Sequence, residues 1–393
     1  MRQLFFLFIL VAVATILRFW QLGGVPASPD WDETALGYNA YSIMQTGKDE
    51  YGKSFPIILR SFDDYKPALY AYLAIPFIKI FGLEVFAVRL PSAILGVVTV
   101  VATYFLLKEL FKDPKIGAIG SFLLAISPWH LQFSRIAFES NVGLACNIFS
   151  ILFFLKGLKK PWLLFLSTIF AGLSLHVYQS EKVFVPLLFL VLIVVFRKEF
   201  FRLPKRYIGA SLFVGMLLVF PLVSYIATEP QALLRARGVS LFADQTPFLA
   251  RTVERLVIDT KERDILGMVL DNRRITYAIG VISGYISHFD LNWLFIAGDQ
   301  PRHHAPNMGL LYLVELPFVL LGIYRFIFGS FERRIKYFIL AWFLIAPIPA
   351  SITSGVPHPI RALNFLPTFQ LFSAIGIIFA AQKITNFKFQ IYL

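Results

Sequence analysis

Long apolar stretches, separated by shorter polar connections, run along most of this chain. An apolar stretch of about 20 residues can cross the ~30 Å hydrocarbon core of a bilayer as a helix. Ten stretches approach that length, and they lie at residues 4–20, 92–107, 116–130, 141–155, 161–176, 183–196, 207–226, 309–328, 337–353 and 363–381. The pattern therefore predicts an all-α polytopic membrane protein with about 10–11 transmembrane helices and additional amphipathic helices on the outer face.

Basic residues mark every second connection between these stretches. They gather at 108–115, 156–160, 197–206, 325–336 and 383–388. Because cytoplasmic connections of membrane proteins are rich in Lys and Arg, these connections are predicted to lie inside. The outward connections are then 21–91, 131–140, 177–182, 227–308 and 354–362. We expect a multi-pass protein of the plasma (inner) membrane whose long polar segments face the extracytoplasmic side.

Residues 67–83 do not fit this alternation. They are apolar enough for a helix, but a full crossing here would place every later basic connection outside. We therefore predict that 67–83 lies along the outer face or dips into it. The alternative is a crossing that is paired with one further helix.

Composition agrees with a membrane protein. Of 393 residues, 57% are hydrophobic and 16% are charged, whereas a soluble domain has about 25% charged residues. The formal net charge is +13, but the basic residues sit at helix ends, where anionic headgroups attract them. Membrane lipids, and not nucleic acid, are therefore the expected partners. The single cysteine, Cys146, excludes a disulfide framework.

The first acidic cluster, Asp30-Trp31-Asp32-Glu33, opens an amphipathic helix predicted over 31–46. Acidic residues beside a membrane helix are functional candidates, because charge is costly there unless water or a partner meets it. Asp30 and Glu33 have the spacing of a capping box, so a structural role competes with a catalytic one for both. Asp32 is not needed for that box and is the first candidate for a general base, followed by Glu33. Trp31 is a candidate for substrate binding.

The second cluster is Asp63-Asp64-Tyr65-Lys66-Pro67. Lys66 could present a cation to a phosphate, while Asp64 is a third candidate catalytic carboxylate and Tyr65 a candidate substrate contact. The alternative interpretation makes Pro67 the first residue of a helix, with Asp63 and Asp64 stabilising its positive end.

Later outer connections add further charged candidates. Arg89, Arg135 and Arg361 are candidates for binding a donor phosphate, and Glu139 is the fourth candidate catalytic carboxylate. The competing interpretations are snorkelling to the interface for Arg89 and an intrahelical i,i+4 ion pair between Arg135 and Glu139.

The outer turn after residue 175 contributes His176 and Tyr178, which are candidates for substrate binding. The adjacent His303 and His304 suit neither a helical metal pair nor a defined ligand set, so we expect no metal site. The sequence contains no Gly-rich phosphate loop or nucleotide-binding fingerprint. A donor substrate on the outer side must therefore arrive already activated, as a lipid with a phosphate-linked sugar does.

The order of these motifs resembles the family 39 and related C-type glycosyltransferases, which include the protein O-mannosyltransferases and the lipid A aminoarabinose transferases. The motifs are Asp32-Glu33, Tyr65-Lys66-Pro67-Ala68-Leu69-Tyr70, Arg89-Leu90-Pro91-Ser92 with Gly96, and Ser134-Arg135 with Glu139. The resemblance covers residues 1–180 and continues more loosely to Pro367. Many members of the family continue into a soluble outer domain, so we interpret 1–393 as a single transmembrane glycosyltransferase domain without that addition.

The resemblance implies inverting transfer of a sugar from a polyprenyl-phosphate donor to an acceptor hydroxyl on a lipid, glycan or protein. It implies that Asp32 is the base or acceptor-positioning carboxylate and that Lys66 and Arg135 lie near the donor phosphate. Asp64 and Glu139 match the other acidic positions of the family. No cofactor is required in this scheme, because a lipid monophosphate leaving group needs less charge neutralised than that of a nucleotide sugar, although a divalent cation is compatible with it.

Three other functions stay open at this point. They are a transporter or flippase of lipid-linked sugars, a non-catalytic membrane subunit, and an oligosaccharide ligase that uses diphosphate lipids. Transporters place ionisable groups near the bilayer midplane in repeated or broken helices. In this sequence the charges gather in the outer connections, which favours the transferase.

Overall fold

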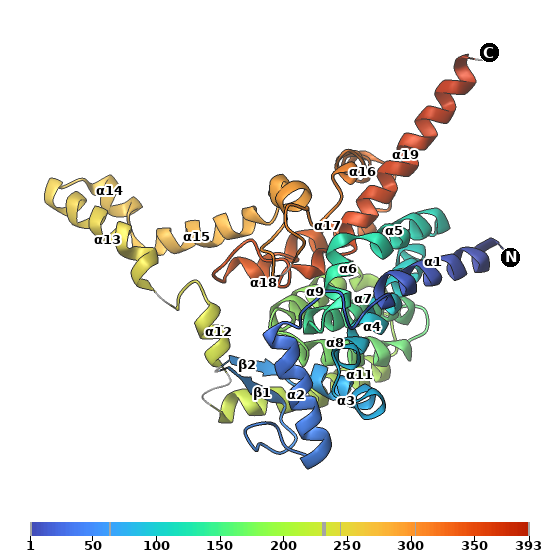
Figure 1. Ribbon diagram of the computed structural model, residues 1–393. Helices are drawn as coiled ribbons and strands as arrows, with labels where there is room; N and C mark the ends of the chain where they lie inside the picture. The colour runs from blue at the N-terminus through green and yellow to red at the C-terminus, as the bar shows by residue number, and fades with distance from the viewer. Residues whose placement is uncertain (1, 63, 230–232, 244, 303, 392–393) are drawn as a thin grey trace.

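The computed structural model describes residues 2–62, 64–229, 233–243, 245–302 and 304–391. Asp63 and His303 lie outside this part of the chain. The described residues form a bundle of helices with one short hairpin beside it, and a helical arm projects from the bundle (Figure 1). The all-α membrane fold expected from the sequence is confirmed.

Each of the ten predicted apolar stretches contains a helix. The helices are α1 (Arg2–Phe19), α4 (Val85–Phe111), α5 (Pro114–Ile126), α7 (Glu139–Gly157), α8 (Leu163–Leu175), α9 (Glu181–Val195), α11 (Lys205–Thr228), α16 (Leu316–Phe328), α17 (Arg333–Ile345) and α19 (Thr368–Ile391). Among the described residues, five helical segments are long and apolar enough to cross a membrane, or six if α5 and the bent continuation α6 (Pro128–Arg135) form one span. The chain is thus a multi-pass membrane protein, and the count of ten crossings stays a prediction.

The centre of the bundle is α7, which packs against α4 and α8. Near the end of the chain, α16 and α19 approach so closely that only glycine fits at two positions. A Cβ atom on Gly322 would lie 1.8 Å from the Phe372 carbonyl oxygen, and one on Gly376 would lie 2.0 Å from the Phe318 carbonyl oxygen. These glycines let the two backbones touch, as small residues do between membrane helices.

The segment after α1 builds a small layer at one end of the bundle. The amphipathic helix predicted over 31–46 is present as α2 (Trp31–Thr46) with the same bounds. It is followed by an antiparallel hairpin of β1 (Ile58–Ser61) and β2 (Asp64–Pro67), in which Leu59 lies opposite Lys66.

The hairpin corrects the interpretation of Pro67 as a first helical residue. Pro67 ends β2, and α3 begins two residues later (Leu69–Phe81). Asp64 consequently lies in a strand and does not stabilise a helix end. The residue before a proline favours extended backbone, and here Lys66 is held extended by its pairing with β1.

Helix α3 accounts for most of the ambiguous stretch 67–83. It has 13 residues, and at 1.5 Å per residue its length is about 20 Å. That is shorter than the ~30 Å hydrocarbon core. Helices α8 and α16 also have 13 residues, so the path of 67–83 relative to the membrane stays a prediction.

The long connection 227–308 is mostly helical. It contains α12 (Leu234–Val239), α13 (Gln245–Glu262), α14 (Ile265–Leu270) and α15 (Arg273–Ser287). In Figure 1 α13 and α14, in yellow, lie farthest from the bundle, and α15 leads back towards it. After a single π-helical turn at Trp293–Ala297, residues 298–302 return to the N-terminal end of α2, where Arg302 contacts Asp30.

The remaining short elements connect the larger helices. They are α10 (Arg197–Phe200), α18 (Ile348–Ser351) and the 3₁₀ turns Leu313–Glu315 and Leu363–Phe365. The turn that contains Asn364 is tied to α7 and α9, because the Asn364 side chain accepts from Asn147 of α7 and donates to Glu181 of α9.

Candidate active site

Asp32 owes its position to the cap of α2. The Asp30 carboxylate accepts a hydrogen bond from the Asp32 backbone N–H at 2.8 Å, and the Glu33 carboxylate accepts one from the Asp30 N–H at 3.1 Å. This is the predicted capping box, and it satisfies backbone donors that a helix start leaves unpaired. The Asp32 side chain takes no part in the box, so it is available for other partners.

Lys66 reaches Asp32 from the hairpin. Its ammonium group pairs with Asp32 Oδ1, and the side chains of Lys66 and Asp32 are only 5% and 17% exposed. Because side chains alternate along a strand, Asp64 lies on the same face of β2 as Lys66. Asp64 Oδ1 accepts from the Tyr65 backbone N–H at 2.9 Å. The structure thus brings the two predicted clusters together through one buried ion pair.

Arg302, which was not among the candidates from the sequence, also binds this cluster. Its Nε donates to Asp30 Oδ2 at 2.7 Å, and its Nη2 donates to Asp30 Oδ1 at 2.9 Å and to Asp32 Oδ2 at 3.1 Å. The guanidinium lies 3.9 Å from the centroid of the Trp31 ring. The pKa of Arg302 is raised above its ordinary value, and the largest cause is its hydrogen bonding to Asp30. The only sequence signal was a lone arginine in a polar outer segment, which is too common to single out.

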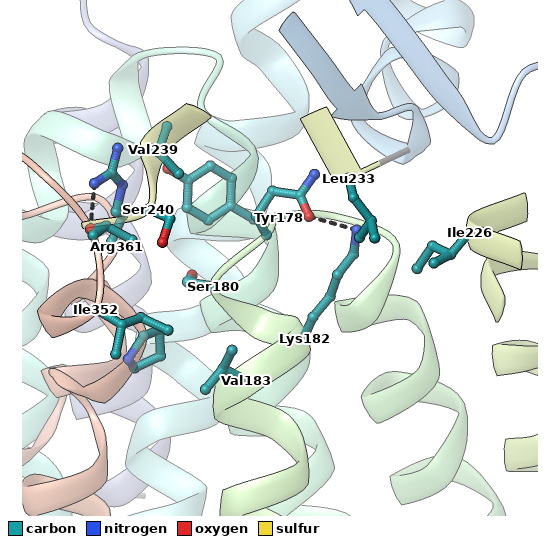
Figure 2. Close-up of a pocket in the computed structure, with 13 residues that line it drawn as sticks. Tyr178, Ser180, Lys182, Val183, Ile226, Leu233, Val239, Ser240, Ile352 and Arg361 are labelled. Atoms are coloured by element: carbon teal, nitrogen blue, oxygen red, sulfur yellow. Dashed lines mark hydrogen bonds between the residues drawn. The ribbon is translucent and has the colours of Figure 1, made fainter. Parts of the chain in front are cut away.

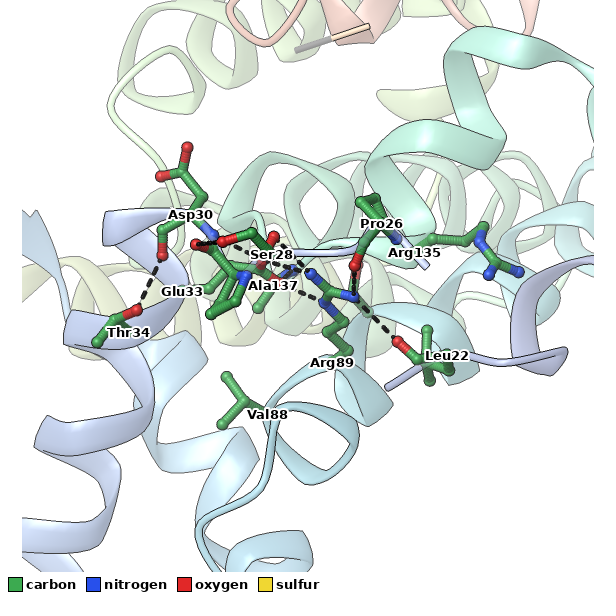
Figure 3. A network of polar contacts seen from close by, with 12 residues as sticks. Leu22, Pro26, Ser28, Asp30, Glu33, Thr34, Val88, Arg89, Arg135 and Ala137 are labelled. Atoms are coloured by element: carbon green, nitrogen blue, oxygen red, sulfur yellow. Dashed lines mark hydrogen bonds and ion pairs between the residues drawn. The ribbon is translucent and has the colours of Figure 1, made fainter. Parts of the chain in front are cut away.

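Glu33 and Arg89 form a second, fully buried ion pair (Figure 3). Arg89 Nε and Nη2 each donate to the Glu33 carboxylate at 2.9 Å. The remaining N–H groups donate to backbone carbonyls of the segment between α1 and α2, those of Leu22, Pro26 and Ser28. A guanidinium has five N–H donors, and these contacts use all of them.

This pair changes the roles expected for both residues. Glu33 also accepts from the backbone N–H of Ala137 at 2.7 Å, so its oxygens are occupied by structural contacts. Arg89 is fully buried, which makes the snorkelling interpretation wrong and leaves no donor for a phosphate. In this arrangement Glu33 and Arg89 fix the fold around the site, and neither the catalytic nor the phosphate-binding role fits them.

Arg135 is likewise engaged by backbone. Its guanidinium donates to the carbonyls of Leu17, Trp20 and Val25, and so holds the end of α1 and the turn after it. The expected intrahelical pair with Glu139 is wrong, because α6 ends at Arg135 and α7 begins at Glu139. These contacts do not fit the phosphate role implied for Arg135 either.

Glu139 faces the cluster from the central helix. It is 3% exposed and interacts electrostatically with Lys66, Asp32 and Asp30. Tyr178, in the turn between α8 and α9, interacts with Arg361, Glu139 and Asp32, and burial raises the pKa of its hydroxyl. At neutral pH Tyr178 is therefore a neutral hydrogen-bond donor beside these charges.

The three other candidate substrate contacts have different surroundings. The Trp31 ring is 58% exposed and is covered on one face by Arg302. The Tyr65 ring is buried in a small apolar cluster with Ile58 and Leu222. His176 uses Nε2 in a 2.7 Å contact with the Leu218 carbonyl of α11. The structure gives Tyr65 and His176 packing contacts, and their role as substrate contacts stays a prediction.

A cavity of about 210 Å³ opens beside Tyr178 (Figure 2). Its wall is largely apolar, with Val183, Ile226, Leu233 and Ile352 among the lining side chains. Two cationic side chains, Lys182 and Arg361, lie on either side of Tyr178 in this view. Arg361 Nη1 donates to Thr353 Oγ1 at 2.6 Å and to the Ser354 carbonyl at 2.8 Å. Lys182 donates to Gln179 Oε1 at 2.6 Å.

Within the described ranges, no group of three or more His, Cys, Asp or Glu side chains is arranged to hold a metal ion. Both carboxylate oxygens of Asp32 are paired with cations, so the donor set around it does not suit a metal in this arrangement.

Comparisons with known proteins bear on the fold and on part of the sequence. Residues 65–225 match the family model described as dolichyl-phosphate-mannose-protein mannosyltransferase, a span that includes Lys66 and Glu139 and begins after Asp32. No curated protein matches the chain in sequence.

Two solved structures share the fold. The archaeal oligosaccharyltransferase AglB from Archaeoglobus fulgidus, in complex with an inhibitory peptide and a dolichol-phosphate, superposes with a TM-score of 0.60 and 15% identity over 98% of this chain. ArnT from Cupriavidus metallidurans, bound to undecaprenyl phosphate, gives a TM-score of 0.60 and 11% identity over 94% of this chain. The chain spans 51% of the first and 59% of the second.

AglB has also been solved in complex with Zn and sulfate, and that structure has a TM-score of 0.55 with this chain. At these identities the superpositions establish the fold, and the family match establishes the resemblance of the segment that contains Lys66 and Glu139. Residues 65–225 carry the sequence pattern of the dolichyl-phosphate-mannose-protein mannosyltransferase family, and the chain has the C-type glycosyltransferase fold.

Proposed function

We propose that this protein is an inverting glycosyltransferase that moves a sugar from a polyprenyl-phosphate donor to an acceptor hydroxyl. The observation that carries the proposal is the Asp32–Lys66 ion pair, set at the start of α2 in a C-type glycosyltransferase fold. A carboxylate and an ammonium group side by side supply the two charges that such a transfer needs. The carboxylate aligns or deprotonates the nucleophile, and the cation stabilises the phosphate that leaves.

The reaction is a single displacement. The acceptor hydroxyl gives its proton to Asp32 as its oxygen bonds to the anomeric carbon. The bond from that carbon to the phosphate oxygen breaks, and polyprenyl phosphate leaves with the electron pair. Attack from the face opposite the phosphate inverts the configuration of the anomeric carbon. In this scheme Lys66 faces the departing phosphate, and Glu139 and Tyr178 interact electrostatically with the Asp32 cluster.

The cavity beside Tyr178 supports a lipid-phosphate donor. Its apolar wall suits the first isoprene units of a polyprenyl chain, and Arg361 and Lys182 offer positive charge to the phosphate. Undecaprenyl phosphate is bound in the ArnT structure and dolichol-phosphate in the AglB structure, and both are polyprenyl phosphates. We infer a donor of this class for the present chain, with a lipid, glycan or protein as acceptor.

The side of the membrane follows from charge. The connections rich in Lys and Arg lie at the opposite ends of the helices from the Asp32 cluster in the predicted topology. We therefore propose that the site faces the extracytoplasmic side of the plasma (inner) membrane.

A metal ion is not part of the proposed scheme. Lys66, and Lys182 and Arg361 at the cavity, already supply positive charge for a monophosphate leaving group, so we expect transfer to continue in EDTA. Loss of activity in EDTA, with recovery on adding Mg²⁺, Mn²⁺ or Zn²⁺ singly, would instead assign a divalent cation to the site.

Oligosaccharide transfer is the second candidate. The likeness to AglB, an oligosaccharyltransferase, favours it. The two candidates share the fold and differ in the donor, which is a single sugar on a monophosphate lipid in one and a lipid-linked oligosaccharide in the other. Donor identity therefore separates them.

The test is transfer by the purified full chain in lipid nanodiscs. A panel of undecaprenyl-phosphate sugars is supplied with a membrane extract as acceptor, and released undecaprenyl phosphate is measured. Asp32→Asn is expected to lower the rate about 10²–10⁴-fold, the usual size of a general-base contribution. Glu254→Gln, which removes an exposed carboxylate of α13, is the matched control and keeps the wild-type rate. Wild-type activity in Asp32→Asn, or no release from any donor by the wild type, contradicts the proposal.

A further inference from the structure

Both carboxylate oxygens of Asp32 have a cationic partner, and these partners compete with an acceptor hydroxyl for the same oxygens. Lys66 holds Oδ1 and Arg302 holds Oδ2. An acceptor hydroxyl needs a carboxylate oxygen to which it can donate its proton. Each oxygen can accept a second hydrogen bond, but departure of one cation would give the acceptor hydroxyl an oxygen that no charged partner occupies.

Arg302 is the more exposed of the two cationic partners of Asp32. The Lys66 side chain is 5% exposed and belongs to the paired strand β2, whereas the Arg302 side chain is 33% exposed. The described residues between Gly298 and Met308 form neither helix nor strand. Moving the Arg302 side chain breaks contacts that are partly open to solvent, whereas the Lys66 side chain is enclosed by the protein.

The guanidinium of Arg302 is also suited to a phosphate. Two of its nitrogens already make a paired contact with the two oxygens of Asp30, which is the geometry in which arginine binds phosphate as well as carboxylate. Its third nitrogen, Nη1, has no hydrogen-bond partner among the described residues. Stacking on Trp31 keeps the planar group oriented.

We propose that Arg302 is a donor-phosphate ligand that Asp30, Asp32 and Trp31 hold in waiting, and that binding of the lipid phosphate draws it away from all three residues. The exchange trades one oxyanion partner for another, so the arginine remains paired throughout. It leaves Asp32 Oδ2 open for the acceptor hydroxyl only when a donor is present. The inference rests on the proposed function, because it names a further ligand of the same donor.

Binding of undecaprenyl phosphate to the purified full chain in detergent tests the ligand role. Arg302→Ala is expected to weaken binding at least 10-fold, and Arg302→Lys several-fold, because an ammonium group cannot make the paired contact. Two control ligands are undecaprenol, which has the lipid chain but no phosphate, and inorganic phosphate, which has no lipid chain. Both are expected to bind much more weakly than undecaprenyl phosphate. Arg274→Ala, an exposed arginine of α15, is the matched control with wild-type binding. Equal binding by Arg302→Ala and wild type overturns the proposal.

A second variant distinguishes an Arg302 that moves to the phosphate from an Arg302 that only stabilises the start of α2. Asp30→Asn keeps an N-cap oxygen for α2 but removes the charge that holds Arg302. If Arg302 must leave Asp30 to reach the phosphate, this variant binds undecaprenyl phosphate several-fold more tightly than wild type. If Asp30→Asn binds undecaprenyl phosphate as the wild type does, or more weakly, Arg302 has a purely structural role and the proposal is overturned.

Trp31 provides a direct readout of the exchange. Departure of the cation from its ring is expected to change tryptophan emission on adding undecaprenyl phosphate, and the change is expected to vanish in Trp31→Phe and Arg302→Ala. If the wild type binds the lipid without this change, the exchange is wrong while the proposed function stands. If the wild type does not bind undecaprenyl phosphate at all, the proposed function and the exchange both fail.

Discussion

At the scale of single residues, the charged groups around α2 form two sets, one with a structural role and one with a proposed role in substrate binding and catalysis. Glu33 and Arg89 are buried and saturated with hydrogen bonds, so they hold the connection after α1 against the bundle. Asp32 and Arg302 are paired but partly exposed, and the buried Lys66 contacts Asp32. The distinction matters because a residue can bind a substrate only with an atom that the fold does not already use.

The structural assignment of Arg89 predicts a loss of stability. Arg89→Met leaves Glu33 charged and buried without its partner, and removal of one member of such a pair costs about 3–5 kcal/mol. The double variant Glu33→Met with Arg89→Met is expected to recover part of that loss. Unfolding in detergent, followed by circular dichroism, provides the measurement. Arg274→Met, at an exposed position of α15, is the control. A stable Arg89→Met protein with weakened undecaprenyl-phosphate binding would restore the phosphate role expected from the sequence.

At the scale of elements, small local features place the site. A capping box sets the start of α2 and so the position of Asp32. The four-residue strand β2 places Lys66 where its ammonium group pairs with Asp32. The connection 227–308 leaves the bundle as a helical arm and returns at Arg302 (Figure 1). The site is assembled at helix starts and connections, where polar backbone and side chains are available, while the helices behind it keep the apolar core.

Close contact between α16 and α19 predicts an unequal effect of two glycine substitutions. Gly322→Ala would place its Cβ 1.8 Å from the Phe372 carbonyl oxygen, so one backbone must shift, and overpacking of this kind costs about 1–3 kcal/mol. Gly209 of α11 has no atom within 4 Å of an added Cβ, and Gly209→Ala is expected to stabilise the helix by about 0.5–1 kcal/mol. Thermal unfolding of both variants in one detergent checks the difference. Equal melting temperatures would show that the two helices do not pack as described.

At the scale of the whole molecule, the arrangement of charge defines two ends. The Asp32 cluster and the cavity occupy one end of the bundle, and the Lys- and Arg-rich connections are predicted to occupy the other. An enzyme whose donor is a membrane lipid needs this separation, because the donor arrives within the bilayer while a polar acceptor comes from the aqueous side.

The predicted orientation can be checked by cysteine labelling in a Cys146→Ser background. Lys48→Cys and Leu83→Cys are expected to react with an impermeant maleimide from the extracytoplasmic side, and Lys160→Cys only from the cytoplasmic side, because basic connections stay inside. All three positions are exposed. Labelling of Leu83→Cys from the cytoplasmic side would mean that residues 67–83 cross the membrane, and would invert the topology of the following helices.

The sequence by itself determined the helices, their polar connections and the cap of α2. These features depend on residues within a few turns of one another, so apolar periodicity and the Asp30–Glu33 spacing were sufficient to predict them. It also singled out Asp32 and Lys66, because charge is rare and costly beside membrane helices.

Only the tertiary structure decided which charges meet. Asp32 pairs with Lys66 across 34 positions and with Arg302 across 270, and Arg89 pairs with Glu33 across 56. From the sequence alone, several arginines were equally good candidates for binding a phosphate. In the structure Arg89 and Arg135 donate to backbone carbonyls. Arg302, from a distant segment, lies beside Asp32 instead. Partner choice over such separations follows from the packing of the whole chain, because an ion pair forms only where the backbone brings two charges within reach.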